Sequence, residues 1–188
     1  MSSAVGKTKI SVVDYVNSLP LAWGILEGRQ KDIFEPAFSM PAECADQLAS
    51  GNVDIGLIPS IEYQRIPGCQ IVPGPIIGSL NRVRSVLLIS MVPLFRIRSV
   101  AYDNGSRASV VLAKVVLNKF CGVSPDFFPA KPNLEEMLAE NDAALLIGDT
   151  ALHYRAANML PNAEKQREYL RDGAEPVQVF DLVERWNN

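Results

Sequence analysis

The residues whose types and spacing most clearly suggest ligand binding are Ser106-Arg107-Ala108-Ser109. They lie at the start of a long run in which apolar residues recur at helical spacing. Asn104-Gly105 comes immediately before them and favours a tight turn, because both residue types tolerate positive φ angles. A helix that begins here presents unpaired backbone N–H groups at the positive end of its dipole. Together with two serine hydroxyls and the guanidinium of Arg107, these groups predict an anion-binding site for a carboxylate or a phosphate. The alternative is a well-capped helix that carries an exposed arginine.

Polar side chains also follow or end several apolar runs that have the length of buried strands. These runs cover residues 9–13, 53–60 and 143–147. Ligands bind at the carboxyl ends of strands in parallel sheets, so the polar residues at these positions are site candidates. They are Asn17, Ser18, Ser60 and Asp149. Asp149 has an alternative role as a helix cap, because aspartate is favoured where a helix begins.

The order of the apolar runs predicts an α/β protein with two similar units. Short strands alternate with helices of about ten residues, which indicates a parallel sheet. We place the boundary near residue 90, which gives a first lobe over 1–90 and a second over 91–188, with a strand expected over 82–90. The first helix should use Leu19, Trp23 and Leu26 as its apolar face.

The composition is that of a globular protein with an ordinary core. The chain has 188 residues, of which 48% are hydrophobic, and a net charge of -3, which argues against a general nucleic-acid surface. The three cysteines (Cys44, Cys69 and Cys121) are widely spaced, so the sequence predicts neither a disulfide framework nor a metal site. Neither a signal peptide nor a membrane-spanning run of about 20 apolar residues is recognisable, and we expect a cytoplasmic protein.

Several segments, spread in order over nearly the whole chain, resemble one known family. They are Tyr15–Leu21, Gly51–Tyr63, Val83–Leu88, Ser106–Ser109 and Leu145–Leu152. In these segments the chain is similar to the chorismate dehydratases of the futalosine route to menaquinone. The resemblance implies a fold like that of type II periplasmic binding proteins, with two α/β lobes, mixed or parallel sheets and flanking helices around a ligand. It also implies that chorismate is converted to 3-enolpyruvylbenzoate and water, with no metal or organic cofactor.

The chain departs from the family at two places. Ala108 stands where the family usually has threonine, so the expected anion-binding site lacks one hydroxyl. Family members also continue well beyond the segment Asp181–Trp186. We therefore expect a first lobe that is incomplete at its C-terminal end, with uncovered apolar surface that favours self-association.

The implied reaction assigns roles to the candidate residues. Chorismate has two carboxylates and a leaving hydroxyl, so its dehydration needs a base, donors around the ring carboxylate and a donor for the departing oxygen. We assign catalysis to Asn17 and Asp149, and substrate binding to Ser18, Ser60, Arg84, Ser85, Ser106, Arg107 and Ser109. Arg84 could instead belong to a solvent-facing row of arginines, and Ser85 could bond only to the backbone.

Alternatives remain open for the base and for the function. His153, Asp14 or the enolpyruvyl carboxylate of the substrate could act in place of Asp149, although Asp14 could instead be a turn residue. Glu62 is expected to be solvated or to cap a helix. Instead of a dehydratase, the chain could be a non-catalytic binding module for a small anionic metabolite or an inactive fragment. The sibling enzyme that makes dihydroxynaphthoate is less similar, because its first motif is rich in proline, cysteine and aspartate.

Overall fold

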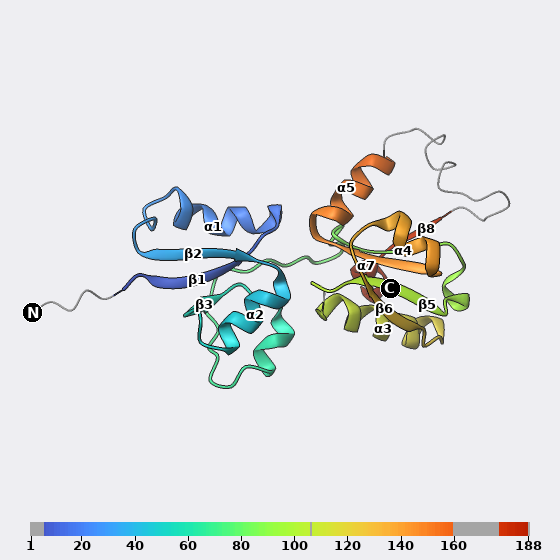
Figure 1. Ribbon diagram of the computed structural model, residues 1–188, viewed down its shortest axis with the longest axis horizontal. Coiled ribbons are helices and arrows are strands. Elements are labelled where there is room, and N and C mark those ends of the chain that lie inside the picture. Colours follow the sequence, from blue (N-terminus) through green and yellow to red (C-terminus); the bar gives the residue numbers. More distant parts are fainter. Residues whose placement is uncertain (1–5, 106, 160–176, 188) are drawn as a thin grey trace, which may run out of the picture. The chain divides into compact units, whose positions relative to one another are not determined.

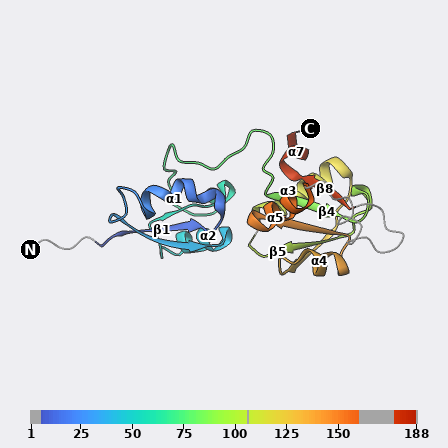
Figure 2. The same ribbon diagram turned by 90° about the horizontal axis from the view of Figure 1, so that it is seen from above.

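The structure is a computed structural model that describes residues 6–105, 107–159 and 177–187. The chain forms two compact units, residues 1–77 and 78–188. This division differs from the expected boundary near residue 90, because the strand β4 (Val86–Ser90) lies inside the sheet of the second unit. Its residues Leu87 to Ile89 are fully buried there. Figures 1 and 2 show the two units, which are described separately below.

The first unit is built on a three-stranded parallel sheet. The strands are β1 (Thr8–Val13), β2 (Phe34–Ser39) and β3 (Ile55–Gly56), in the order β2-β1-β3. The helix α2 (Pro41–Ala49) packs on β1 and β3 and buries only small side chains, which are Ala42, Cys44 and Ala45. The helix α1 (Leu19–Leu26) packs on β2.

The apolar side chains of α1 do not point inward as the sequence pattern predicts. Leu19 is 45% exposed and Trp23 is 63% exposed, whereas Ala22 is the buried residue of the helix. The expectation of an apolar face of Leu19, Trp23 and Leu26 that packs on the core is therefore wrong for Leu19 and Trp23, whereas Leu26 is half-buried. Periodicity identifies the helix correctly, but it carries no information about whether the neighbouring sheet is broad enough to cover a large side chain.

The second unit is built on a five-stranded mixed sheet in the order β6-β5-β7-β4-β8. β4 is antiparallel to both of its neighbours, and the remaining pairs are parallel. The other strands are β5 (Ser99–Asp103), β6 (Asp126–Ala130), β7 (Ala143–Ile147) and β8 (Gln178–Asp181). The helices are α3 (Arg107–Cys121), α4 (Leu134–Glu140), α5 (Gly148–Met159) and α7 (Leu182–Asn187). The structure thus confirms a mixed α/β fold with flanking helices.

Helices cover both faces of the second sheet. On one face, α3 and Leu182 of α7 pack against a cluster that includes Leu88 and Leu145. On the other face, α4 and α5 pack against a cluster that includes Leu87 and Leu146. Adjacent residues of one strand therefore enter opposite cores, as the two-residue period of a strand requires.

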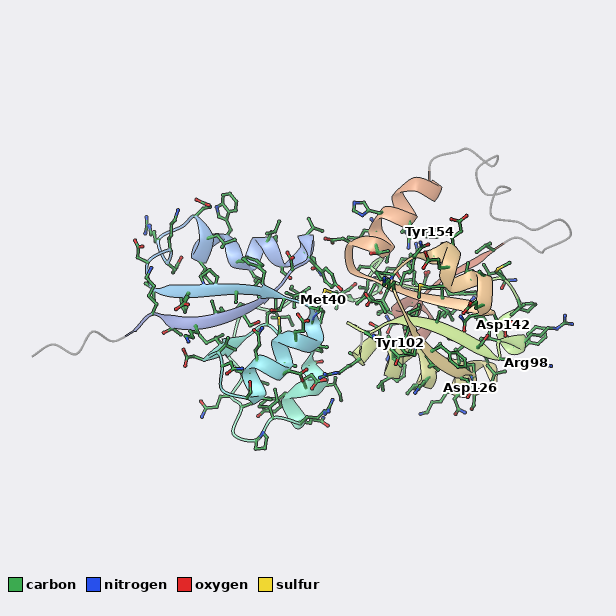
Figure 3. The ribbon with its side chains drawn as sticks, viewed as in Figure 1. Met40, Arg98, Tyr102, Asp126, Asp142 and Tyr154 are labelled. Atoms are coloured by element: carbon green, nitrogen blue, oxygen red, sulfur yellow. The ribbon has the colours of Figure 1, made fainter. Side chains whose placement is uncertain are left out.

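Asp142, which precedes β7, joins the start of β7 to the start of β5 at one end of the strands of the second sheet. Its carboxylate oxygen Oδ2 accepts hydrogen bonds from the backbone N–H groups of Arg98 (2.8 Å) and Ser99 (3.2 Å). The backbone N–H of Asp142 in turn donates to the hydroxyl of Ser99. Figure 3 shows Arg98, Asp142 and Asp126 together at this end of the sheet, where β5, β6 and β7 begin. No helix among the described residues is long and apolar enough to span a membrane.

Truncation of Leu145 tests the position of β7 in the core. Leu145 is fully buried, so Leu145→Ala should lower the free energy of unfolding by about 2–5 kcal/mol. Val111→Ala is the control: Val111 is 55% exposed on α3, and its truncation should cost about 0.5 kcal/mol or less. Urea denaturation followed by tryptophan fluorescence, to which Trp186 beside Phe120 contributes, measures both values. Equal stabilities of the two variants would contradict this packing.

Candidate functional site

Several chain segments meet at the second edge of the five-stranded sheet, opposite Asp142. β5 and β7 are parallel with Tyr102 opposite Leu145, so both strands end at this edge. β4 runs in the reverse direction and begins there, with Val86 opposite Ile147. β8 is antiparallel to β4 and also ends there, at Asp181. The starts of α5 and α7 therefore adjoin the segment that precedes β4, and the start of α3, which follows β5, lies at the same edge with β7 between β5 and β4. We call this edge the carboxyl edge of the second unit.

The start of α3 is one part of this edge. Asp103 ends β5, and its side chain accepts a hydrogen bond from the N–H of Gly105 at 3.1 Å, which shapes the turn into the helix. Arg107 is the first residue of α3 and is exposed, and Ser109 is half-buried in the first turn. Backbone N–H groups in a first helical turn have no intrahelical partner, so they are available to an anion. Ser106 lies outside the described residues.

The segment before β4 is joined directly to the start of α5. The carbonyl of Ser85 accepts a hydrogen bond from the N–H of Gly148 at 2.9 Å. Gly148 has a φ of 57°, a left-handed conformation that glycine adopts without steric cost. Ser85 is 8% exposed, and Asp149 is half-buried as the second residue of α5. The structure thus brings Ser85 and Asp149 to neighbouring positions, through a bond made by the backbone of Ser85 and not by its hydroxyl.

Arg84 has an unusual backbone conformation at the same edge. Its φ is 60°, and it is the one non-glycine residue with positive φ in the described part of the chain. This conformation costs an ordinary residue about 1–2 kcal/mol. The N–H of Arg84 donates to Oδ2 of the buried Asp181 at 2.8 Å, while the Arg84 side chain is exposed. Sequence reasoning missed Asp181, although an aspartate between an apolar strand and a helix is the same signal that identified Asp149.

The candidates of the first unit lie near the carboxyl edge of its own sheet. Asn17 and Ser18 belong to a 3-10 helix (Val16–Ser18) that follows β1, and Ser60 begins another (Ser60–Gln64) after β3. Asn17 and Ser60 are exposed. Ser18 is 1% exposed, and its hydroxyl has no hydrogen-bond partner among the described residues. The parallel strands therefore bring these three residues to one edge, as their positions in the sequence predict.

Glu62 differs from its expected role. Its side chain is only 6% exposed and pairs with the guanidinium of Arg65, with Oε1 and Nη1 3.2 Å apart. The expectation that Glu62 is solvated or caps a helix is wrong. A local pattern of one glutamate in a polar helix start contains no sign of the burial that the surrounding chain imposes.

The cysteines and the histidine do not suggest a different kind of site. Burial raises the pKa of the thiols of Cys44 and Cys121. Each of these side chains therefore favours the neutral thiol over the nucleophilic thiolate. His153 is exposed on α5, one turn beyond Asp149. Within the described ranges, no group of three histidine, cysteine, aspartate or glutamate residues is placed to hold a metal ion.

The carboxyl edge of the second unit therefore combines two kinds of chemical group. The first turn of α3, the Ser109 hydroxyl and the guanidinium groups of Arg84 and Arg107 can attract and hold an anion. The carboxylate of Asp149 can accept a proton. This set suits a small anionic molecule from which or to which a proton is transferred.

Comparison with known proteins gives relatives over nearly the whole chain. The family model described as "Menaquinone biosynthesis" matches residues 8–188. The protein named chorismate dehydratase in Thermus thermophilus is 33% identical over 174 residues, which are 92% of this chain and 61% of that relative. The chain thus spans about three-fifths of the length of the curated relative.

A solved structure supports the fold independently of close sequence similarity. The crystal structure of a protein from Archaeoglobus fulgidus matches 98% of this chain and 62% of its own, with a TM-score of 0.65 and 12% identity. At this level of identity the match concerns the fold alone. Because the family model covers almost every residue and the curated relative exceeds 30% identity, the chain belongs to the menaquinone biosynthesis family.

Proposed function

We propose that this chain is a chorismate dehydratase, which converts chorismate to 3-enolpyruvylbenzoate and water. The observation that carries the proposal is the gathering of the α3 start, the Arg84-Ser85 segment and Asp149 at one sheet edge. The name of the Thermus thermophilus relative supports the choice of substrate. The activity is a proposal because the chain spans 61% of that relative.

The chemistry of chorismate suits such an edge. The proton that leaves is on the ring carbon bearing the enolpyruvyl ether, and this carbon is attached to the ring double bond that is conjugated to the ring carboxylate. As the C–H bond breaks, negative charge spreads into that carboxylate, and donors around it lower the barrier. The electron pair then forms the new ring double bond while the neighbouring C–O bond breaks. Hydroxide leaves and is protonated to water, so no electron carrier is needed.

Each candidate residue has a role in this proposal. The first-turn N–H groups of α3, with Ser109 and Arg107, bind the ring carboxylate, and Arg84 and Ser85 bind the second carboxylate. Asp149 receives the ring proton, a role that the enolpyruvyl carboxylate of the substrate could take instead. In the first unit, Asn17 keeps its assignment to catalysis, and Ser18 and Ser60 keep theirs to substrate binding, at the carboxyl edge of that unit's own sheet. Ser106 keeps its assignment to substrate binding.

The proposal includes a fold like that of type II periplasmic binding proteins. In such a fold each lobe supplies ligand-binding residues from the carboxyl edge of its own sheet. Both units of this chain have their candidate residues at that edge. This common position supports the finer assignment of the fold.

Direct incubation with chorismate tests the proposed function. The purified 188-residue chain should convert chorismate to an aromatic product, which chromatography and ultraviolet absorbance detect. Calorimetry on the same sample should show binding. Binding without product would contradict the dehydratase and favour the binding module, and the absence of both would remove the site.

Two single substitutions test the assigned residues. Asn17→Ala and Ser109→Ala should each lower kcat/KM by about 10- to 1000-fold, because each removes a donor to developing charge. Asn52→Ala and Ser124→Ala are matched controls, since both residues are exposed and neither follows the end of a strand. Steady-state kinetics and circular dichroism should show slow but folded site variants and unaffected controls. Unchanged turnover in both site variants would contradict the assignment.

A further inference from the structure

We propose that Asp181 is a positioning residue of the carboxyl edge, where it fixes the backbone of Arg84 and Ser85. The inference rests on the proposed function, because that function assigns Arg84 and Ser85 to the substrate. Asp181 itself ends β8 and is 5% exposed, so its carboxylate acts from inside the protein.

The two oxygens of Asp181 have different partners. Oδ1 accepts hydrogen bonds from the N–H groups of Val183 (3.1 Å) and Glu184 (3.2 Å), which caps α7. Oδ2 accepts the hydrogen bond from the N–H of Arg84 at 2.8 Å, across 97 positions in the sequence. A helix cap needs only one acceptor, and asparagine or serine supplies it as well as aspartate. The second oxygen is therefore not needed for the cap, and it accepts the hydrogen bond of Arg84.

The bond to Asp181 fixes a segment that would otherwise favour another conformation. Arg84 has a φ of 60°, which a residue with a side chain avoids unless its surroundings hold it. The next residue is held from the other side, because the Ser85 carbonyl accepts the N–H of Gly148. Two hydrogen bonds thus hold the Arg84-Ser85 segment. Asp181 accepts one from its first N–H, and its last carbonyl accepts the other from the N–H of Gly148, next to Asp149. Loss of the first bond frees the start of the segment while the second bond remains.

Asp142 provides a matched control in the same unit. Its Oδ2 also accepts the N–H of an arginine, Arg98, at 2.8 Å, and that of Ser99 at 3.2 Å. It lies at the opposite edge of the sheet, away from every assigned site residue of the second unit. Asp142→Asn therefore replaces the charged acceptor of the same kind of interaction by a neutral one, and so weakens it without changing the carboxyl edge.

The experiment compares Asp181→Asn, Asp181→Ser and Asp142→Asn in the full chain. Asparagine keeps one acceptor for α7 but directs an amide donor toward the N–H of Arg84, and serine keeps the cap with no second group. Thermal denaturation measures folding, NMR hydrogen exchange measures protection of the Arg84 N–H, and steady-state kinetics with chorismate measures kcat and KM.

The expected result separates positioning from stability. Both Asp181 variants should fold, lose protection of the Arg84 N–H and lower kcat/KM by about 10- to 100-fold, as misplaced binding groups do. Asp142→Asn should lower Tm by about as much as the Asp181 variants do. It should nevertheless keep kcat/KM within about twofold of the value for the unmodified chain.

Three results would overturn the inference, and they are distinguishable. If the Asp181 variants exchange the Arg84 N–H faster but match Asp142→Asn in kcat/KM, the inference fails and the proposed function stands. If neither Asp181 variant folds, or the exchange is unchanged, Asp181 only stabilises the fold. If the unmodified chain neither binds nor converts chorismate, the proposed function fails and Asp181 has no substrate site to position.

Discussion

The reversed direction of β4 is the constraint on which the candidate site of the second unit depends. β4 lies between β7 and β8 and is antiparallel to both, so it begins where its neighbours end. A parallel strand of the same five residues would place Arg84 and Ser85 about 16 Å away, at the opposite edge. With the reversed strand, the chain before β4 meets the start of α5 and the residue that precedes α7, at the same edge as the first turn of α3. The direction of one strand thus decides which residues are available to a ligand.

The groups that gather at this edge include backbone groups as well as side chains. Helix first turns supply N–H donors whose direction is set by the helix, and the hydrogen bonds of Ser85 and Arg84 hold the adjoining segment. Such groups change little during a reaction, which is the property that makes donors effective toward developing charge. In the proposed dehydration, the acidity of the substrate comes from its own conjugation. The protein then needs to stabilise charge at a carboxylate rather than to supply an unusually strong base.

The sequence predicts local elements well and their partners poorly. The apolar run 143–147 and the helix after Gly105 are recognisable because a buried strand and an amphipathic helix each have a distinct period, and both are present as β7 and α3. The run at 82–90 also predicts a strand, but its pattern does not say which sheet the strand joins or in which direction. The exposure of Trp23 and the burial of Glu62 depend on what covers them, so they too were outside the reach of local patterns. The positive φ of Arg84 occurs together with a hydrogen bond to a residue 97 positions away, which no local pattern contains.

Backbone-amide NMR during a chorismate titration tests the central claim most directly, because it locates binding without requiring turnover. The account predicts that the largest shifts occur in the described residues of the carboxyl edge, which are Arg84, Ser85, Arg107, Ser109, Gly148 and Asp149. Residues of the opposite edge, Arg98, Ser99 and Asp142, should be unaffected. Shifts confined to that opposite edge, or none in the second unit at saturating chorismate, would contradict the account.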